Sequence, residues 1–293
     1  MSQFIQLHLL TSYPPSNLNR DDLGRPKTAK MGGFDRLRIS SQSLKRTWRV
    51  SDIFCNGVSE SETVNLFDNT LPNNIGVRTK KLSPHWVTPY LVNKGIDNDI
   101  AVKWSKDLCR AFGPMENDEN KQSQLAHVSG FELLGFSSVI EQVAVYLTNG
   151  KTTSFLEDFI SLIKKRDAKK KSDDIKKAND AILKLCSQEF LERGKYSVDI
   201  ALFGRMLASS PEFNADAACQ VAHALSVHSV VVEDDYFTAV DDLNDGKTDS
   251  GSAHIGESGF AAALFYSNIN INKTQLIENL NGDEALANRA IKA

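Results

Sequence analysis

A long segment with helical patterning interrupts a chain whose two ends are patterned as strands. Residues 97–112 and 131–148 carry apolar residues at helical spacing, and residues 154–192 contain apolar and basic positions in turn. Before them, residues 3–11 are rich in Ile, Leu and Phe and predict a strand, and residues 41–54 predict a helix. From about residue 58 to 190 we therefore expect an inserted, mainly helical module.

Strand patterning returns after Gly194. Residues 198–203, 222–231 and 260–271 are predicted strands, and Asn272 is predicted to cap a last helix. Apart from the insertion, this order follows the β-α-β-β-α-β arrangement of ferredoxin-like and RNA-recognition folds, with the last strand missing. The predicted fold class is therefore α+β.

Basic residues are concentrated near the start of the chain. Between Arg20 and Arg49 there are nine Lys or Arg and three acids, although the formal net charge of the whole chain is -3. Ser40 or Ser41 is a suitable N-cap for the following helix, which would direct backbone N–H groups and cations at one spot. This combination predicts an anion site, although a basic helix by itself is also typical of a solvated surface.

A long loop precedes this helix. About 25 residues separate it from the first strand, and loops of that length in compact domains are usually functional or disordered. We interpret loop and helix together as a track for phosphate groups. The residues predicted to contact phosphate are Arg20, Lys27, Lys45, Arg46 and Arg49, and Ser40 and Gln42 would either add hydrogen bonds or act only as helix caps.

Two further segments have an unusual charge. Residues 164–177 contain the densest basic run of the chain, which alone would be typical of a solvated helix face or a loop. Residues 233–258 contain eight acids and one Lys, and they enclose the apolar island from Tyr236 to Val240. We expect the second segment to form an exposed, projecting loop with an aromatic tip.

Composition and motifs argue against several classes of protein. The four cysteines are scattered, without the spacing of a zinc site or a disulfide framework. The first residues lack the features of a signal peptide, and no apolar run approaches about 18 residues. GxSxG, P-loop, GxGxxG and HExxH motifs are absent. We expect a cytoplasmic protein that is not an enzyme, does not bind a membrane and needs no metal or cofactor.

Six sequence blocks carry a family resemblance. They are LNRDD at 18–22, RISSQSLKR at 38–46, VDIALFGRM at 198–206, AHALSVH at 222–228, YFTAVDDL at 236–243 and GSAH at 251–254. In this order they resemble the CasC backbone subunits of the type I-E CRISPR Cascade surveillance complex, in the RAMP superfamily. Members of that family are usually longer, with a further segment that supplies the rest of the palm.

The resemblance implies three parts. The first is an RNA-recognition-like palm, formed by residues 1–57, 193–229 and 259–293. The second is a helical finger at 58–192, and the third is a thumb, a β-hairpin at 230–258. The strand that would complete the palm is missing at the C-terminal end.

The resemblance also implies a function. Several copies would stack head to tail along one CRISPR RNA, beside other Cascade subunits, and present it to target DNA in antiviral defence; a recruited nuclease-helicase would cut. RNA contacts are implied for Ser40, Gln42 and Met206 besides the basic residues above. The thumb residues Tyr236, Phe237, Thr238 and Val240 would wedge a base step, and Lys164, Lys165, Lys169, Lys170 and Lys171 of the finger would contact target DNA. For Met206 and Phe237, ordinary packing is the alternative.

Two other functions stay open at this stage. A metal-dependent, guide-directed ribonuclease, as in type III backbone subunits, could use the acid pairs Asp21-Asp22 or Asp241-Asp242 to hold magnesium. A general single-stranded RNA-binding protein is the other possibility. The aromatic signature of RNA-recognition motifs is absent from the sequence, which predicts that the palm sheet does not bind bases by stacking.

Overall fold

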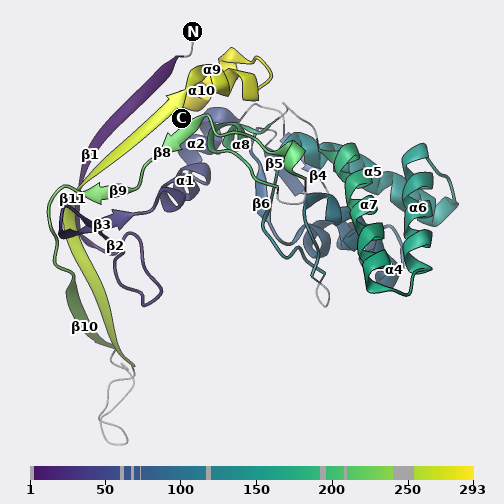
Figure 1. The fold of residues 1–293 in the computed structure, drawn as a ribbon, viewed down its shortest axis with the longest axis horizontal. Helices are drawn as coiled ribbons and strands as arrows, with labels where there is room; N and C mark the ends of the chain where they lie inside the picture. Colours follow the sequence, from purple (N-terminus) through teal and green to yellow (C-terminus); the bar gives the residue numbers. More distant parts are fainter. Residues whose placement is uncertain are drawn as a thin grey trace, which may run out of the picture. The chain divides into compact units, whose positions relative to one another are not determined.

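The computed structural model describes residues 3–59, 63–66, 69–72, 74–116, 120–191, 196–207, 210–239 and 254–293 (Figure 1). The described chain forms two compact units. We call residues 3–50 with 219–271 the sheet unit, and residues 51–218 with 272–293 the helical unit.

The sheet unit is built on one seven-stranded sheet of the described chain. The path β1-β11-β9-β3-β2 forms its body, and β8 and β10 also pair with β11. The strands are β1 (Phe4–Ser16), β2 (Thr28–Met31), β3 (Phe34–Ile39), β8 (Cys219–Val221), β9 (Ala224–Ser226), β10 (Glu233–Ala239) and β11 (His254–Asn272). Because β11 lies between β1 and β9, the order is that of the split β-α-β arrangement, and the predicted α+β class is confirmed. The position beyond β1 carries no strand from the described residues.

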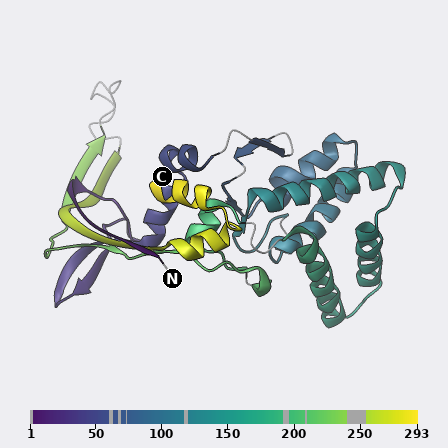
Figure 2. The ribbon, with the colours of Figure 1, turned by 90° about the horizontal axis from the view of Figure 1, so that it is seen from above.

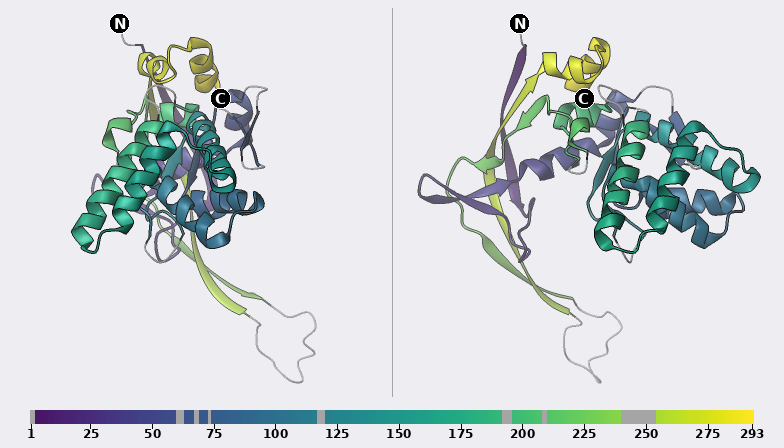
Figure 3. Two further views of the ribbon diagram at one scale, coloured as in Figure 1. Left: turned by 90° about the vertical axis from the view of Figure 1, so that its right-hand side faces the viewer. Right: turned by 45° about the vertical axis from the view of Figure 1, so that its right-hand side comes forward.

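Strand β11 holds the sheet unit together. Its residues Ala261, Ala263 and Phe265 are buried and join Leu37 and Ile39 of β3 in one apolar core. Side chains of a strand alternate between two faces, so the residues between them face the other way. The helix α1 (Ser41–Arg49) covers the buried face through Leu44. Toward its start, β11 continues beyond the sheet as a two-stranded arm with β10 (Figure 3).

The helical unit contains the long helix α5 (Gly130–Asn149) and many further elements (Figure 2). These are α2 (Asp52–Val58), β4 (Thr63–Leu66), β5 (Asn69–Pro72), β6 (Val77–Thr79), a π-helix (Ser83–Val87), α3 (Thr88–Asn93), α4 (Asn98–Cys109), a 3-10 turn (Arg110–Phe112), β7 (Ala126–Val128), α6 (Ser154–Asp167), α7 (Ser172–Phe190), α8 (Val198–Phe203), a second 3-10 turn (Pro211–Phe213), α9 (Lys273–Asn279) and α10 (Glu284–Lys292). Helices α6 and α7 lie side by side, and α7 also packs on α5.

Aromatic rings fill the core of the helical unit. The ring of Phe136 on α5 lies edge-on to Phe190, with 5.0 Å between centroids, and edge-on to Phe112, with 5.1 Å. Pairs of this geometry add to the free energy gained by burying the rings. Helix α5 is apolar and long enough to cross a membrane by composition alone, but its buried residues belong to this core, so packing accounts for its hydropathy.

Helical patterning predicted the helical unit well, and the short strands were predicted less well. The predicted helix at 131–148 is α5, and the segment 154–192 divides into α6 and α7. The strand predicted at 198–203 is wrong: these residues form α8. Residues 198–202 are all buried, so the segment has neither the period of a strand nor that of a helix. Gly204, with φ +78°, ends it.

Three other predicted elements differ from the structure. The helix predicted at 41–54 is interrupted after α1, because Ser51 caps a separate helix α2 with its Oγ accepting from the N–H of Phe54 at 3.2 Å. The strand predicted at 222–231 is only β9, after the separate strand β8. The segment 233–258 is no loop where the structure describes it, since β10 pairs there with β11, as in the β-hairpin that the family resemblance implied.

Replacement of Phe136 by Ala tests the role of the aromatic core. Phe136 is fully buried, so Phe136→Ala is expected to lower the free energy of unfolding by about 3–5 kcal/mol. Urea unfolding followed by circular dichroism measures it. Phe131→Ala on the same helix is the matched control, because Phe131 is 39% exposed, and its effect should stay below about 1 kcal/mol. Equal losses for the two variants would contradict this account.

Candidate nucleic-acid interface

The N-terminus of α1 is fixed by three hydrogen bonds. Ser40 is the N-cap, as predicted, with its Oγ accepting from the N–H of Ser43 at 3.3 Å. The N–H of Ser40 donates to Asn19 Oδ1 at 2.9 Å, and the N–H of Ser41 donates to His223 Nδ1 at 2.9 Å. Some of the backbone N–H groups that were predicted to bind an anion thus donate hydrogen bonds within the chain instead. The positive charge at this helix comes mainly from its side chains.

Helix α1 carries three of the predicted phosphate residues. It has no acid in its first turn, and Arg46 and Arg49 lie in its last turn. Arg46 is exposed, whereas Lys45 and Arg49 are half-buried. Gln42 is exposed, and its Oε1 accepts from the hydroxyl of Ser41 at 3.4 Å. The helix therefore presents positive charge on an outer surface of the sheet unit.

The long loop predicted before α1 is mostly regular structure. Strand β1 continues to Ser16, and β2 and β3 form a hairpin in which Met31 pairs with Phe34. Gly32 and Gly33 make its two-residue turn, with φ of +64° and +83°, a conformation that favours glycine. A Gly-Gly pair between two short runs was the signal for this hairpin, and the sequence analysis missed it. The remaining loop is residues 17–27.

Asp21 organises the remaining loop. Its Oδ1 accepts from the N–H groups of Leu23 and Arg25, each at 2.9 Å, as in an Asx turn. The N–H of Lys27 donates to the carbonyl of Asn19 at 2.8 Å, and Asn19 also holds Ser40. The loop that carries Arg20 and Lys27 is therefore tied to the start of α1. Asp21 serves as a turn former here.

A cleft of about 610 Å³ lies between this loop and the base of the β10–β11 hairpin. Arg20 and Phe237 both line it, although they come from distant sequence blocks. Arg25 on one wall forms an ion pair with Asp234 on the other, with 2.8 Å between Nη2 and Oδ1. Asn17 Oδ1 is buried there with no hydrogen-bond partner among the described residues. The structure thus brings together one predicted phosphate residue and one predicted wedge residue.

The hairpin fixes the orientation of Phe237. Phe237 pairs with Gly256 across the two strands. A Cβ on Gly256 would lie 2.4 Å from Cζ of Phe237, so the ring rests on the glycine backbone. The ring is 44% exposed and Tyr236 is 66% exposed, so neither is a core residue. Thr238 is also exposed, and Val240 and the acids Asp241 and Asp242 lie outside the described residues.

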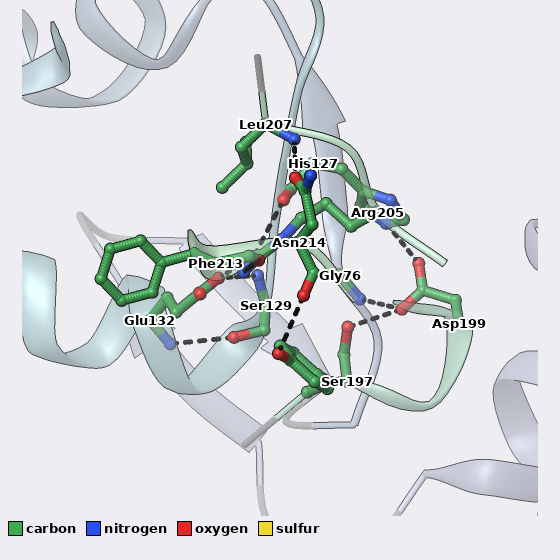
Figure 4. Close-up of polar contacts among 11 residues, drawn as sticks. Gly76, His127, Ser129, Glu132, Ser197, Asp199, Arg205, Leu207, Phe213 and Asn214 are labelled. Atoms are coloured by element: carbon green, nitrogen blue, oxygen red, sulfur yellow. Dashed lines mark hydrogen bonds and ion pairs between the residues drawn. The ribbon is translucent and has the colours of Figure 1, made fainter. Parts of the chain in front are cut away.

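Met206 lies in the helical unit, between Arg205 and Leu207, which belong to a buried polar network (Figure 4). Its side chain is 81% exposed. The adjacent Arg205 is buried, with its Nη1 2.6 Å from Glu132 Oε2 and its Nη2 donating to the carbonyl of Phe213 at 3.0 Å. Glu132 in turn forms a capping box with Ser129 at the start of α5. The network anchors the segment that presents Met206, so this side chain is not core filler.

Asp199 forms the second half of this network. Its carboxylate accepts from Ser197 Oγ at 2.6 Å and from the N–H of Gly76 at 2.8 Å, and lies 2.7 Å from His127 Nε2. Burial alone would raise the pKa of Asp199, but these hydrogen bonds and the charge of His127 hold the pKa at about 2. Ser197, Asp199 and His127 are the residue types of a catalytic triad. Here, however, the carboxylate of Asp199 contacts both Ser197 and His127, whereas in a catalytic triad the histidine lies between the serine and the carboxylate. The three residues therefore do not have the arrangement of a triad.

The five predicted finger lysines gather at one turn. Lys164 and Lys165 lie in the last turn of α6, and Lys169, Lys170 and Lys171 lie between α6 and α7; all five are exposed. The neighbouring Arg166 is different, because it forms ion pairs with Asp107 and Asp167. Exposed lysines without buried partners are available for an external anion.

Groups that could hold a metal ion are not found among the described residues: no cluster of three or more His, Cys, Asp or Glu occurs there. Burial raises the pKa of the thiols of Cys109, Cys186 and Cys219, in the last case to about 11. These thiols are therefore protonated near neutral pH, and they are poor ligands and nucleophiles.

Comparison with known proteins identifies the family. The model of the CT1975-like protein family matches residues 5–293, which is nearly the whole chain. The chain belongs to this family. None of the curated proteins matches it.

Two solved structures are similar to this member of the CT1975-like family. One is described as "CRISPR RNA-guided surveillance complex, pre-nicking"; its chain is 29% identical, with a TM-score of 0.68, and the match covers 99% of this chain and 70% of that one. The other, "CRISPR RNA-guided surveillance complex", is 24% identical with a TM-score of 0.60, over 99% of this chain and 69% of that one, and this likeness is one of fold. The resemblance to a backbone subunit of a Cascade-type complex, drawn from the six sequence blocks, is confirmed, whereas its type I-E subtype stays a prediction.

The pKa of Asp199 leads to a prediction about acid stability. Because its pKa is lowered in the folded protein to about 2 from the usual 3.8, the contribution to stability is complete above about pH 4 and is lost as the pH falls toward 2. The shift corresponds to about 2 kcal/mol. Urea unfolding between pH 6 and 2.5 measures it, with Asp199→Asn expected to flatten this part of the profile. An unchanged profile in the variant would contradict the assignment.

Proposed function

We propose that this chain binds CRISPR RNA as a repeated backbone subunit of a Cascade-type surveillance complex. The observation that carries the proposal is the cleft that Arg20 and Phe237 both line. The loop lining the cleft is bonded to the start of the basic helix α1 through Asn19. A similar chain at 29% identity belongs to a structure described as an RNA-guided surveillance complex. The type I-E subtype is part of the proposal.

The basic residues suit a subunit that holds an RNA of any sequence. Arg20, Lys27, Lys45, Arg46 and Arg49 would contact phosphates, and phosphate contacts position a nucleic acid without reading its bases. Ser40 and Gln42 would contribute at the start of α1. The guide bases would then stay exposed for pairing with target DNA.

Exposed apolar groups would shape the bound strand. Tyr236, Phe237, Thr238 and Val240 of the hairpin would wedge between bases, which unstacks them and kinks the strand. Met206 would meet the guide from the helical unit. Asp234 of the hairpin pairs with Arg25 of the same chain, but Glu233 and Asp235 are exposed, and we propose that these acids face basic groups of the next copy. Such a head-to-tail contact is heterologous and can propagate along the RNA.

The other expected properties belong to the same proposal. The protein would act in the cytoplasm, without catalysing a reaction, beside other Cascade subunits and a recruited nuclease-helicase. Magnesium-dependent cleavage of a guide-complementary RNA, lost in Asp21→Ala or Asp241→Ala, would overturn the non-catalytic part. Measurement of the mass of the complex purified with its RNA gives the number of copies, and a single copy per RNA would overturn the backbone role.

Neutralising α1 tests the RNA contact. The triple variant Lys45→Gln, Arg46→Gln, Arg49→Gln is expected to weaken guide RNA binding and to flatten its dependence on salt. Each lost contact with a single strand lowers the slope of log K against log salt by about 0.7, hence by about 2 for three. Filter binding at several salt concentrations measures both effects. An unchanged slope would remove α1 from the RNA site.

The finger lysines provide the reciprocal test. Changing Lys164, Lys165, Lys169, Lys170 and Lys171 to Gln is expected to leave guide RNA binding intact, because these residues are proposed to contact DNA. Affinity of the assembled complex for target duplex should fall, with a loss of about 0.9 in salt slope per contact. Target affinity and slope equal to those of the unmodified complex would refute the DNA contact.

A further inference from the structure

The face of the sheet opposite α1 carries two aromatic rings in contact. His8 of β1 is exposed and Tyr266 of β11 is 40% exposed. Their rings are stacked, with centroids 6.1 Å apart and an angle of 28° between planes. Because Phe265 belongs to the buried core, Tyr266 points to the opposite face. We call this the open face of the sheet.

Hydrogen bonds hold the two rings in place. His8 Nδ1 lies 2.7 Å from the hydroxyl of Tyr266 and 3.2 Å from Asn268 Nδ2. Because an amide nitrogen can only donate, Nδ1 accepts, and its one lone pair is shared by the Asn268 amide and the Tyr266 hydroxyl. The proton of the neutral ring is then on Nε2, so the pair presents an N–H donor beside two ring faces.

Positive charge lies on the same face. Tyr266 and Arg38 are both direct partners of Leu225, so the three residues form a row across β11, β9 and β3. At about 5 Å per strand, the Cα atoms of Tyr266 and Arg38 are about 10 Å apart. Arg38 Nε is buried and has no hydrogen-bond partner among the described residues.

Acids are missing from this part of the open face. From Ala262 to Asn270 on β11, and at the partners of these residues on β8 and β9, the side chains facing this way are apolar, amide or aromatic, and β3 adds Arg38. The chain as a whole has a net charge of -3. A face with one Arg, two aromatic rings and no acid among these residues suits a polyanion with stackable groups.

We propose that the open face is a stacking platform for the bases of a single-stranded RNA, with Arg38 contacting a neighbouring phosphate. The inference deepens the proposed function and rests on it for the identity of the ligand. It adds a second RNA-binding surface, on the opposite side of the sheet from α1. Aromatic side chains on the exposed sheet of RNA-recognition motifs bind RNA bases in this way. In this chain the rings of His8 and Tyr266 lie outside the sequence signature of those motifs, whose absence argued against stacking.

RNA accounts for this face better than a second copy of the chain does. The core of an interface between copies is enriched in apolar residues and depleted of charge. Here the centre holds an imidazole, a phenol, an amide and a guanidinium, and Leu225 beneath them is half-buried. Each of these groups offers a ring face or a hydrogen-bond donor to a nucleotide.

The test compares Tyr266→Ala with Tyr266→Phe in the full chain. Removing one stacked base is expected to weaken binding of a single-stranded RNA by roughly 5- to 150-fold, with an unchanged salt slope because no charge is lost. Tyr266→Phe keeps the ring and should stay within about twofold. Phe131→Ala, which deletes an exposed ring from the helical unit, is the matched control for a nonspecific loss of aromatic surface.

Two further measurements separate stacking from a structural effect. Arg38→Gln should lower the salt slope by about 0.7. Ultraviolet crosslinking followed by mass spectrometry should attach RNA to the peptides that contain His8 or Tyr266. Circular dichroism of each variant reports whether the sheet is folded.

The outcomes distinguish this inference from the proposed function. If Tyr266→Ala binds RNA as tightly as the unmodified chain and no crosslink forms at His8 or Tyr266, the platform is refuted while the α1 site stands. If the α1 triple variant binds normally and Tyr266→Ala does not, the platform is supported and the α1 site fails. If Tyr266→Ala reduces only self-association of the RNA-free protein, the face is a contact between copies and the inference is wrong.

Discussion

The pairing of β11 is the constraint on which the sheet unit depends. This one strand of 19 residues pairs with β8, β9 and β10 and lies beside β1. Its alternation sends Phe265 into the core and Tyr266 to the open face. A slip of one residue would exchange these two faces along the whole strand. The pairing register of β11 therefore determines three features together: the core of the sheet unit, the position of the hairpin and the residues on the open face.

The sequence predicted long helices better than short buried elements. Helix α5 was predicted within one residue at each end, because it is a long apolar segment bounded by the N-cap Ser129 and by Gly150. Helix α8 was predicted as a strand, because it is buried almost all round. The hairpin of β2 and β3 was missed, because each strand is too short to show alternation.

The sequence predicted which residues belong to the candidate site, but it did not predict which of them contact one another. Ser40 was predicted as the cap of α1, but its partner Asn19 and the bond between Ser41 and His223 join distant parts of the chain. The presence of Arg20 and Phe237 in the lining of one cleft likewise depends on the register of the hairpin. Within the basic run, the sequence does not distinguish Arg166 from Lys165. The structure distinguishes them, because Arg166 forms an ion pair with buried Asp107, whereas Lys165 is exposed to solvent. The charge of Arg166 therefore supports the fold.

The contact of Phe237 with Gly256 shows that the orientation of the Phe237 ring depends on the residue at position 256. The ring occupies the space that any side chain at position 256 would need. A methyl group there would leave the chemistry of the ring unchanged while displacing it from the glycine backbone. Positions 237 and 256 therefore depend on each other, because the glycine at 256 determines the orientation of the phenylalanine ring at 237. In a protein whose copies are proposed to repeat along one RNA strand, a substitution at position 256 would reorient the Phe237 ring in every copy.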